Sequence, residues 1–206
     1  MKKIILVLLF SAFFANLHSQ EKFNFSRHTL KECTDFESSQ HSAFVDTIIF
    51  GILKSHSQNR LDIKNTKTLI FKRQDNDFRL PLHVWYHFDP TSGVLEGVRY
   101  YWGLYNPAFT PKGNEELLIS LSKNEQSFRD KFDNVYKVLK EQLGKQTSEE
   151  VIADNPSAYV KNIYWENKTK MVELSISFSR QLKPIGDEGF LYSKFEIEVT
   201  TTYKDR

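Results

Sequence analysis

The side chains whose types and spacing could do chemistry gather between positions 83 and 105. Two histidines, His83 and His87, are followed by Asp89, and Glu96 lies further along. Imidazole and carboxylate groups serve as zinc ligands and as acid–base catalysts. On a strand, however, four residues span about 13 Å, which is too far for two imidazoles to converge on one zinc ion. We therefore expect no metal and no cofactor, and histidines that are either solvated or, for His87, paired with Glu96.

The same stretch is rich in aromatic side chains. Tryptophan and tyrosine combine a flat apolar surface with a polar group, so they can stack on a sugar or a similar ligand. Strand propensity and core packing explain such a composition equally simply. The aromatic residues are Trp85, Tyr86, Phe88, Tyr100, Tyr101, Trp102 and Tyr105. Packing is the simpler interpretation, and a binding platform centred on Trp85 is the best specific hypothesis.

Two functions remain open at this point. The preferred one is a non-catalytic domain that binds an unknown protein or small molecule, such as a glycan. The residues proposed for that binding surface are Trp85, His83, His87, Glu96 and Tyr100. The alternative is a cell-envelope hydrolase that uses polar residues around His83, His87 and Asp89. The sequence contains no phosphate-binding glycine loop, no Gly-x-Ser-x-Gly elbow and no His-Glu-x-x-His helix, so binding is preferred.

A β-hairpin is expected to position these residues. Its loop, Pro90-Thr91-Ser92-Gly93, has proline early and glycine last, which is typical of a type I turn closed by a left-handed residue. The loop predicts the pairs Asp89–Val94, Phe88–Leu95, His87–Glu96, Trp85–Val98 and His83–Tyr100. Alternation along the strand then places Leu82, Val84, Tyr86 and Phe88 on the core face. The five proposed binding residues would share the opposite face.

The remaining pattern predicts an α+β fold, with an antiparallel sheet of about seven strands and one long amphipathic helix packed on it. The helix, about 123–143, should begin at the capping box Ser122–Glu125 and end at Gly144. Its apolar stripe contains Phe128, Phe132, Val135, Tyr136, Leu139 and Leu143. Besides the hairpin, strands are expected at 68–72, 117–121, 159–166, 170–179 and 191–203.

The segment 42–54 fits two structures. Its apolar residues recur at intervals of three and four, which predicts a second helix. Its β-branched residues, Thr47-Ile48-Ile49, would equally suit a buried strand. We expect the helix.

The first nineteen residues indicate export. Lys2 and Lys3 precede a short apolar run, 4–15, which is typical of a cleaved signal peptide and too short for a permanent transmembrane helix. The mature chain should begin near Gln20 and be periplasmic or secreted. It should form a single α+β domain, 20–206, with a flexible N-terminal arm at about 20–40.

The charge balance argues against nucleic acid as a partner, and the cysteine content argues against disulfides and lipidation. Without Lys2 and Lys3, the 28 basic side chains fall to 26, which equals the 26 acidic ones. A neutral chain with no basic block lacks the footprint of a nucleic-acid-binding protein. Cys33 is the only cysteine, so no intrachain disulfide can form. The charged residues Lys31 and Glu32 before it argue against lipidation, and we expect an incidental thiol.

Overall fold

The computed structural model describes residues 23–48, 66–103, 125–156, 158–179, 183–185, 190–192 and 195–204. Within these ranges the chain forms two helices, α2 (Leu30–Ser39) and α4 (Glu125–Leu143), and a large antiparallel sheet. The sheet has eight strands rather than about seven, in the order β1-β2-β3-β4-β10-β7-β6-β5. Their bounds are β1 Ala43–Ile48, β2 Lys67–Arg73, β3 Leu82–Phe88, β4 Leu95–Trp102, β5 Ser148–Asn155, β6 Ala158–Glu166, β7 Lys170–Ser179 and β10 Phe195–Tyr203. Strands β8 (Lys183–Ile185) and β9 (Phe190–Tyr192) form a separate pair.

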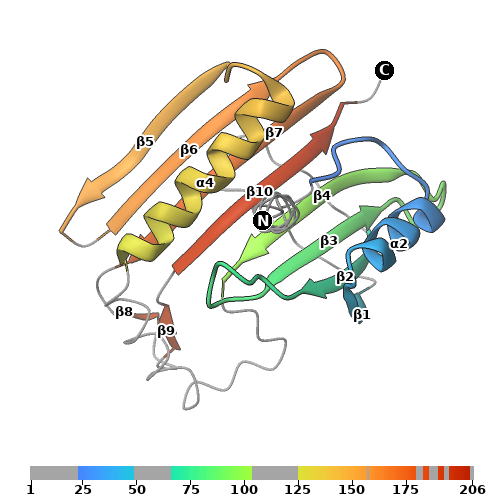
Figure 1. Ribbon diagram of the computed structural model, residues 1–206, viewed down its shortest axis with the longest axis horizontal. Helices are drawn as coiled ribbons and strands as arrows, with labels where there is room; N and C mark the ends of the chain where they lie inside the picture. Colours follow the sequence, from blue (N-terminus) through green and yellow to red (C-terminus); the bar gives the residue numbers. More distant parts are fainter. Residues whose placement is uncertain are drawn as a thin grey trace, which may run out of the picture.

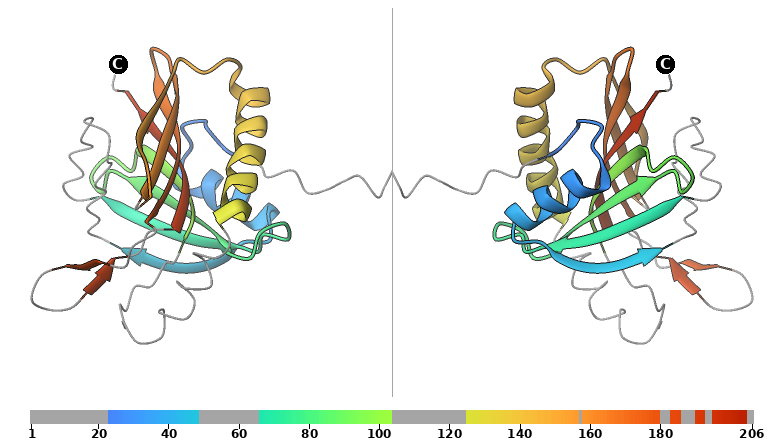
Figure 2. Two further views of the ribbon diagram at one scale, coloured as in Figure 1. Left: turned by 90° about the vertical axis from the view of Figure 1, so that its left-hand side faces the viewer. Right: turned by 90° about the vertical axis from the view of Figure 1, so that its right-hand side faces the viewer.

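Both helices lie on the same face of this sheet. In Figure 1, α4 crosses the half formed by β10, β7 and β6, and α2 lies beside β2 and β3. Figure 2 shows that the sheet is bent and that the helices occupy the angle between its two halves. The apolar core fills this angle, because the large buried side chains of the sheet, including Tyr86, Tyr100, Trp102 and Phe178, belong to the same cluster as those of α4.

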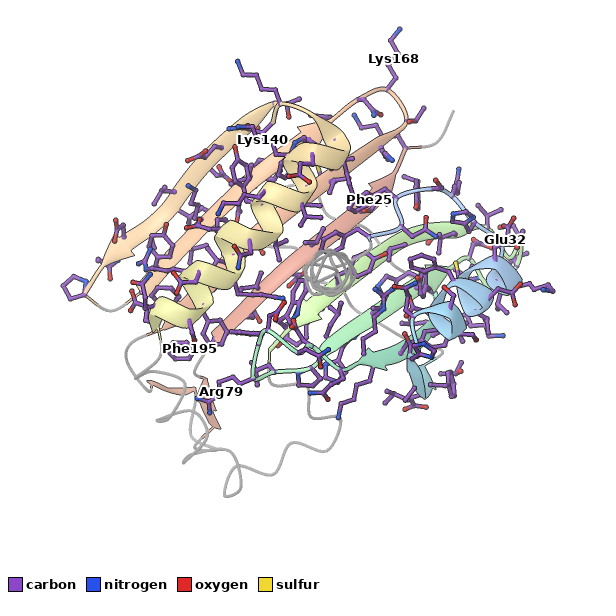
Figure 3. The ribbon with its side chains drawn as sticks, in the orientation of Figure 1. Phe25, Glu32, Arg79, Lys140, Lys168 and Phe195 are labelled. Carbon is purple, nitrogen blue, oxygen red and sulfur yellow. The ribbon has the colours of Figure 1, made fainter. Side chains whose placement is uncertain are left out.

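The long helix is confirmed. Phe128, Phe132, Val135 and Leu139 are all buried, as the stripe predicted. Phe195 of β10 lies beside the first turn of α4 (Figure 3), and its ring centroid is 5.7 Å from that of Phe128. Gly144 ends the helix with a φ of 81°, a backbone conformation that glycine adopts without strain. The predicted capping serine, Ser122, and the predicted strand 117–121 lie outside the described residues.

The hairpin is confirmed, but its register is shifted. Phe88 pairs with Leu95 as predicted, and Gly93 closes the loop with a φ of 68°. Glu96 is then an extra residue, so His87 pairs with Gly97, Trp85 with Arg99 and His83 with Tyr101. This β-bulge moves every later residue of β4 to the other face from the predicted one.

The prediction of a helix at 42–54 was wrong for its described part. Residues Ala43–Ile48 form β1, which pairs with β2 at the edge of the sheet. Phe44 and Val45 are 59% and 40% exposed, so their spacing reflects no buried helical stripe. The β-branched content of the segment was the better guide.

The segment expected to form an N-terminal arm contains a helix and two buried aromatic residues where the chain is described. Thr29 and Glu32 form a capping box that begins α2. Before it, Phe23 and Phe25 are buried against Tyr100 with ring centroids 5.0 and 6.4 Å away. The segment therefore packs in the core on the same side as the helices, and Figure 3 labels Phe25 there.

Buried ion pairs join each helix to the rest of the core. From α2, the fully buried Glu37 accepts two hydrogen bonds from Arg73, at 2.9 and 2.6 Å, and one from the Tyr86 hydroxyl at 2.6 Å. From α4, Lys131 pairs with Asp75 at 2.6 Å, and Asp75 also accepts the Trp102 indole N–H at 2.8 Å. These charged groups are buried and each has an oppositely charged partner, as a protein interior requires.

Candidate functional site on the polar face

The face of the sheet turned away from α2 and α4, here called the polar face, carries polar side chains from six adjacent strands. Two cross-strand rows run across it from β2 to β6. The first contains Ile70, Trp85, Arg99, Thr200, Glu173 and Tyr164, and the second Lys72, His83, Tyr101, Glu198, Ser175 and Asn162. Strand alternation alone brings these side chains to one surface.

Arg99 lies at the centre of this surface. Its guanidinium carbon is 5.0 Å from the Trp85 ring centroid and 4.8 Å from the Tyr101 ring centroid, within the range of cation–π contacts. Its Nη2 donates to Glu198 at 2.6 Å. Arg99 is therefore held by the Trp85 ring of β3, the Tyr101 ring of β4 and the Glu198 carboxylate of β10.

Gly103 makes room for this arrangement. A Cβ atom at that position would lie 2.3 Å from the Tyr101 hydroxyl oxygen, so any side chain there would displace the tyrosine ring. The orientation of Tyr101 on the polar face thus depends on a residue at the end of β4.

Three of the five proposed binding residues reach the polar face together. His83, Trp85 and His87 alternate along β3, opposite the core residues Leu82 and Val84. Tyr100 does not join them, because the bulge places it opposite Val84, where it is fully buried in the core. Glu96 lies in the bulge, and Gly97 takes the position opposite His87 that was predicted for Glu96.

Both histidines are buried and neutral. Burial, followed by the charge of Lys72, lowers the pKa of His83 to about 4. Burial, followed by the charge of Arg99, lowers the pKa of His87 to about 3. His87 Nδ1 is 2.8 Å from the Thr68 hydroxyl oxygen, whereas its Nε2 has no hydrogen-bond partner.

Asp89 belongs to the hairpin loop rather than to this surface. One of its carboxylate oxygens accepts the backbone N–H groups of Thr91 and Ser92, at 2.8 and 2.6 Å, and the Ser92 hydroxyl at 3.0 Å. These hydrogen bonds, first that from the Ser92 backbone, lower the pKa of Asp89. The side chain has the geometry of a turn-stabilising aspartate.

The other end of the polar face is acidic. Glu173 is 9% exposed, and burial, followed by the charges of Glu198 and Glu150, raises its pKa to about 7. Glu150 accepts hydrogen bonds from Tyr164, at 2.5 Å, and Asn162, at 3.3 Å. A carboxyl group that titrates near neutrality is unusual outside functional sites.

No group of three or more His, Cys, Asp or Glu residues in the described ranges lies close enough together to hold a metal ion. Cys33 is also unsuited to chemistry, because it is fully buried in α2 and burial raises its thiol pKa to about 12.

Sequence reasoning missed Arg99, Tyr101, Glu198 and Glu173. The predicted register placed Val98 and Tyr100 opposite Trp85 and His83, where Arg99 and Tyr101 lie, because a bulge is not visible in hydrophobic alternation. Gly97 was the available signal, since an isolated glycine in a strand indicates a bulge or a close backbone approach. Here a Cβ atom at Gly97 would lie 2.9 Å from the Thr201 carbonyl oxygen of β10.

No protein-family model, curated protein or solved structure matches this chain. Neither described helix combines the length and the apolar character needed to cross a membrane.

Proposed function

We propose that this chain is exported and acts as a non-catalytic binding domain that captures a ligand or a protein partner on the polar face. The observation that supports this best is the stack of Trp85, Arg99 and Tyr101 beside Glu198. Tryptophan, tyrosine and arginine are the residues that dominate binding energy at protein interfaces. Trp85 is only partly buried, on a face that neither α2 nor α4 covers.

The alternative, a hydrolase built on His83, His87 and Asp89, has less support. A general base needs a pKa near the working pH. The two histidines have lowered pKa values and are buried, and the Asp89 carboxylate is engaged by its own loop. Binding therefore remains the better proposal.

Backbone NMR of the mature chain, 20–206, tests where ligands bind. The probes are oligolysine, a neutral oligosaccharide mixture, an acidic oligosaccharide mixture and a short-chain fatty acid. We expect at least one class to shift resonances of β3, β4 and β10 together. Shifts confined to other elements, or none with any class, would contradict a binding role for the polar face.

Two variants test whether ligand capture depends on Trp85 and on the position of the Tyr101 ring. Trp85→Ala should weaken capture of the active probe at least about tenfold while moving the unfolding midpoint little. Gly103→Ala should weaken it as well, because it displaces the Tyr101 ring without removing it. Phe44→Ala is the matched control, since Phe44 is an exposed aromatic residue on β1, away from the stack. Equal loss of stability and capture in Trp85→Ala would identify Trp85 as a core residue instead.

Export has its own test. The intact mass of the protein recovered from the periplasm or culture medium should correspond to a chain that begins close to Gln20. An acyl group on Cys33 would contradict both the sequence argument and the burial of that thiol. Recovery of the full chain from the inner membrane with Met1 attached would contradict export.

A further inference from the structure

Two buried nitrogen atoms on the polar face lack hydrogen-bond partners within the described structure. They are His87 Nε2 and Arg99 Nε, and each is shielded from solvent. His87 Nδ1 contacts the Thr68 hydroxyl, and Arg99 Nη2 donates to Glu198. Buried polar groups in native proteins are nearly always satisfied, by protein, water or ligand.

The two nitrogens belong to one neighbourhood. His87 pairs with Gly97, and a Cβ atom at Gly97 would lie 4.0 Å from Cδ2, the ring carbon bonded to Nε2. The edge of the imidazole that carries Nε2 therefore faces β4, on which Arg99 is the next residue of the same face. Trp85 borders both groups, with its ring centroid 6.3 Å from the imidazole and 5.0 Å from the guanidinium carbon.

The hydrogen-bonding character of this neighbourhood selects a hydroxyl group. Arg99 Nε–H can only donate, so the ligand atom beside it must accept. His87 is neutral, and its Nε2 donates or accepts according to whether Thr68 donates to Nδ1 or accepts from it. A hydroxyl group has one donor hydrogen and two acceptor lone pairs, so it can accept from Arg99 Nε and either donate to His87 Nε2 or accept from it.

The charges of the face argue against an anionic ligand. Glu198 already neutralises Arg99 at 2.6 Å, and Glu173 and Glu196 lie on the same face. A carboxylate or phosphate placed beside Arg99 would meet these acidic groups at close range, because the described lysine of the same face, Lys72, lies two strands away on β2. A neutral molecule with several hydroxyl groups and an apolar ring face fits better, because it can also stack on Trp85.

We propose that Trp85, His87 and Arg99 form a subsite for one pyranose ring of a neutral oligosaccharide, with a ring hydroxyl bridging His87 Nε2 and Arg99 Nε and the ring stacked on Trp85. This inference rests on the proposed function, because it names the ligand class of the same face.

The test measures the affinity of the mature chain for neutral tetrasaccharides of glucose, mannose, galactose, xylose and N-acetylglucosamine. Calorimetry gives the affinity, and ¹⁵N NMR of the histidine side chains reports on Nε2 of His87. We expect one tetrasaccharide to bind and to shift the Nε2 resonance. Tetragalacturonate, an acidic probe, should bind at least about tenfold more weakly.

Variants separate the subsite from general effects. His87→Phe keeps a ring but removes Nε2, and Arg99→Lys keeps the charge but removes Nε. Each should weaken binding about tenfold, which is the scale of one lost hydrogen bond to a polar ligand. Ser177→Ala is the control, because Ser177 is a buried polar residue of the same face on β7. If His87→Phe fails to fold, Arg99→Lys still tests the proposal.

The outcomes distinguish this inference from the proposed function. Binding of tetragalacturonate or tetralysine at the polar face, with no neutral tetrasaccharide bound, would overturn the sugar subsite and leave the binding function intact. A neutral tetrasaccharide that binds equally well to both variants would also overturn it. Should no tetrasaccharide bind, the two nitrogens are satisfied by ordered water only, and the subsite is rejected.

Discussion

At the scale of single residues, Glu173 carries the clearest electrostatic consequence. Its carboxyl group is buried beside Glu198 and Glu150, with Tyr164 and Thr200 as direct cross-strand neighbours. Its pKa is raised from an ordinary value of 4.5 to about 7, so the folded protein holds this proton more tightly than the unfolded chain does. The protein should therefore lose stability as the pH rises from about 4.5 through 7.

Glu173→Gln removes this penalty. At pH 8 the variant should be more stable than the parent, by up to about 3 kcal/mol, because only the parent buries a charge there. At pH 4 the two should unfold at nearly the same denaturant concentration, since both side chains are neutral. Urea unfolding at the two pH values measures the difference. An equal effect at both would show that packing, and not charge, sets the result.

The buried ion pair of Glu37 and Arg73 should make the effects of two substitutions on the unfolding free energy non-additive. Arg73→Met leaves the fully buried Glu37 carboxylate without its counter-charge and should cost about 3–5 kcal/mol of unfolding free energy. Combining it with Glu37→Leu should recover much of that loss, because no uncompensated charge then remains. A double-mutant cycle in chemical denaturation measures the coupling. Additive losses would mean that the two side chains stabilise the fold independently.

At the scale of elements, the two helices should respond differently to single substitutions. Phe132 is 4% exposed in the middle of α4, so Phe132→Ala should cost about 3–5 kcal/mol through lost burial and a cavity. Thr29→Ala removes only the cap of α2 and should cost about 1 kcal/mol. Chemical denaturation of both variants should give this order. The reverse order would mean that α4 contributes little to the core.

The elements also show what the sequence could and could not predict. The helix at 125–143 was predictable because its apolar stripe is wide and it ends in glycine. Strand β10 was predictable because its buried and partly exposed residues alternate, and β7 because Val172, Leu174, Ile176 and Phe178 recur at every second position. In α2, by contrast, only Cys33 and Glu37 are buried, so hydrophobic periodicity is weak and only the Thr29–Glu32 capping box indicates a helix.

Only part of the candidate site was predictable, because the face of a residue depends on its own strand whereas its neighbours depend on the register between strands. The face of Trp85 follows from alternation within one strand, which is local. The partners of Trp85 follow from pairing between strands, and one bulge at Glu96 exchanges Val98 and Tyr100 for Arg99 and Tyr101. The strand β5 was missed because its residues are mostly exposed, so no alternation between a buried and a solvent-facing side marks it in the sequence.

At the scale of the whole molecule, both edges of the sheet are exposed and irregular. Edge strand β1 has a bulge at Val45 and β5 has one at Ile152, next to the exposed residues Phe44 and Val151. Bulges and acidic residues at an edge hinder pairing with another chain. The exposed apolar side chains beside them, by contrast, favour pairing with another chain.

Replacing one of these side chains should therefore change association and not folding. Ile152→Lys should lower light scattering at high protein concentration while leaving the unfolding midpoint nearly unchanged, since Ile152 is 53% exposed. Val94→Lys, at an exposed position of the hairpin loop end, serves as the matched control for added charge. Equal reductions in both variants would point to net charge and not to the β5 edge.

The first described residues of the chain are held by some of the last. The backbone N–H of Asn24 donates to the Tyr100 hydroxyl, Lys170 donates to the Phe25 carbonyl, and the Tyr203 hydroxyl donates to the Ser26 carbonyl. A ribosome makes the N-terminal segment first and Tyr203 of β10 last, so the segment can complete its contacts only when nearly the whole chain has been made. Until then Phe23 and Phe25 are held by fewer partners and are more available to chaperones and proteases. Ribosome-bound chains that stop before Phe195 should be cleaved readily in this segment, and complete chains should resist the same protease.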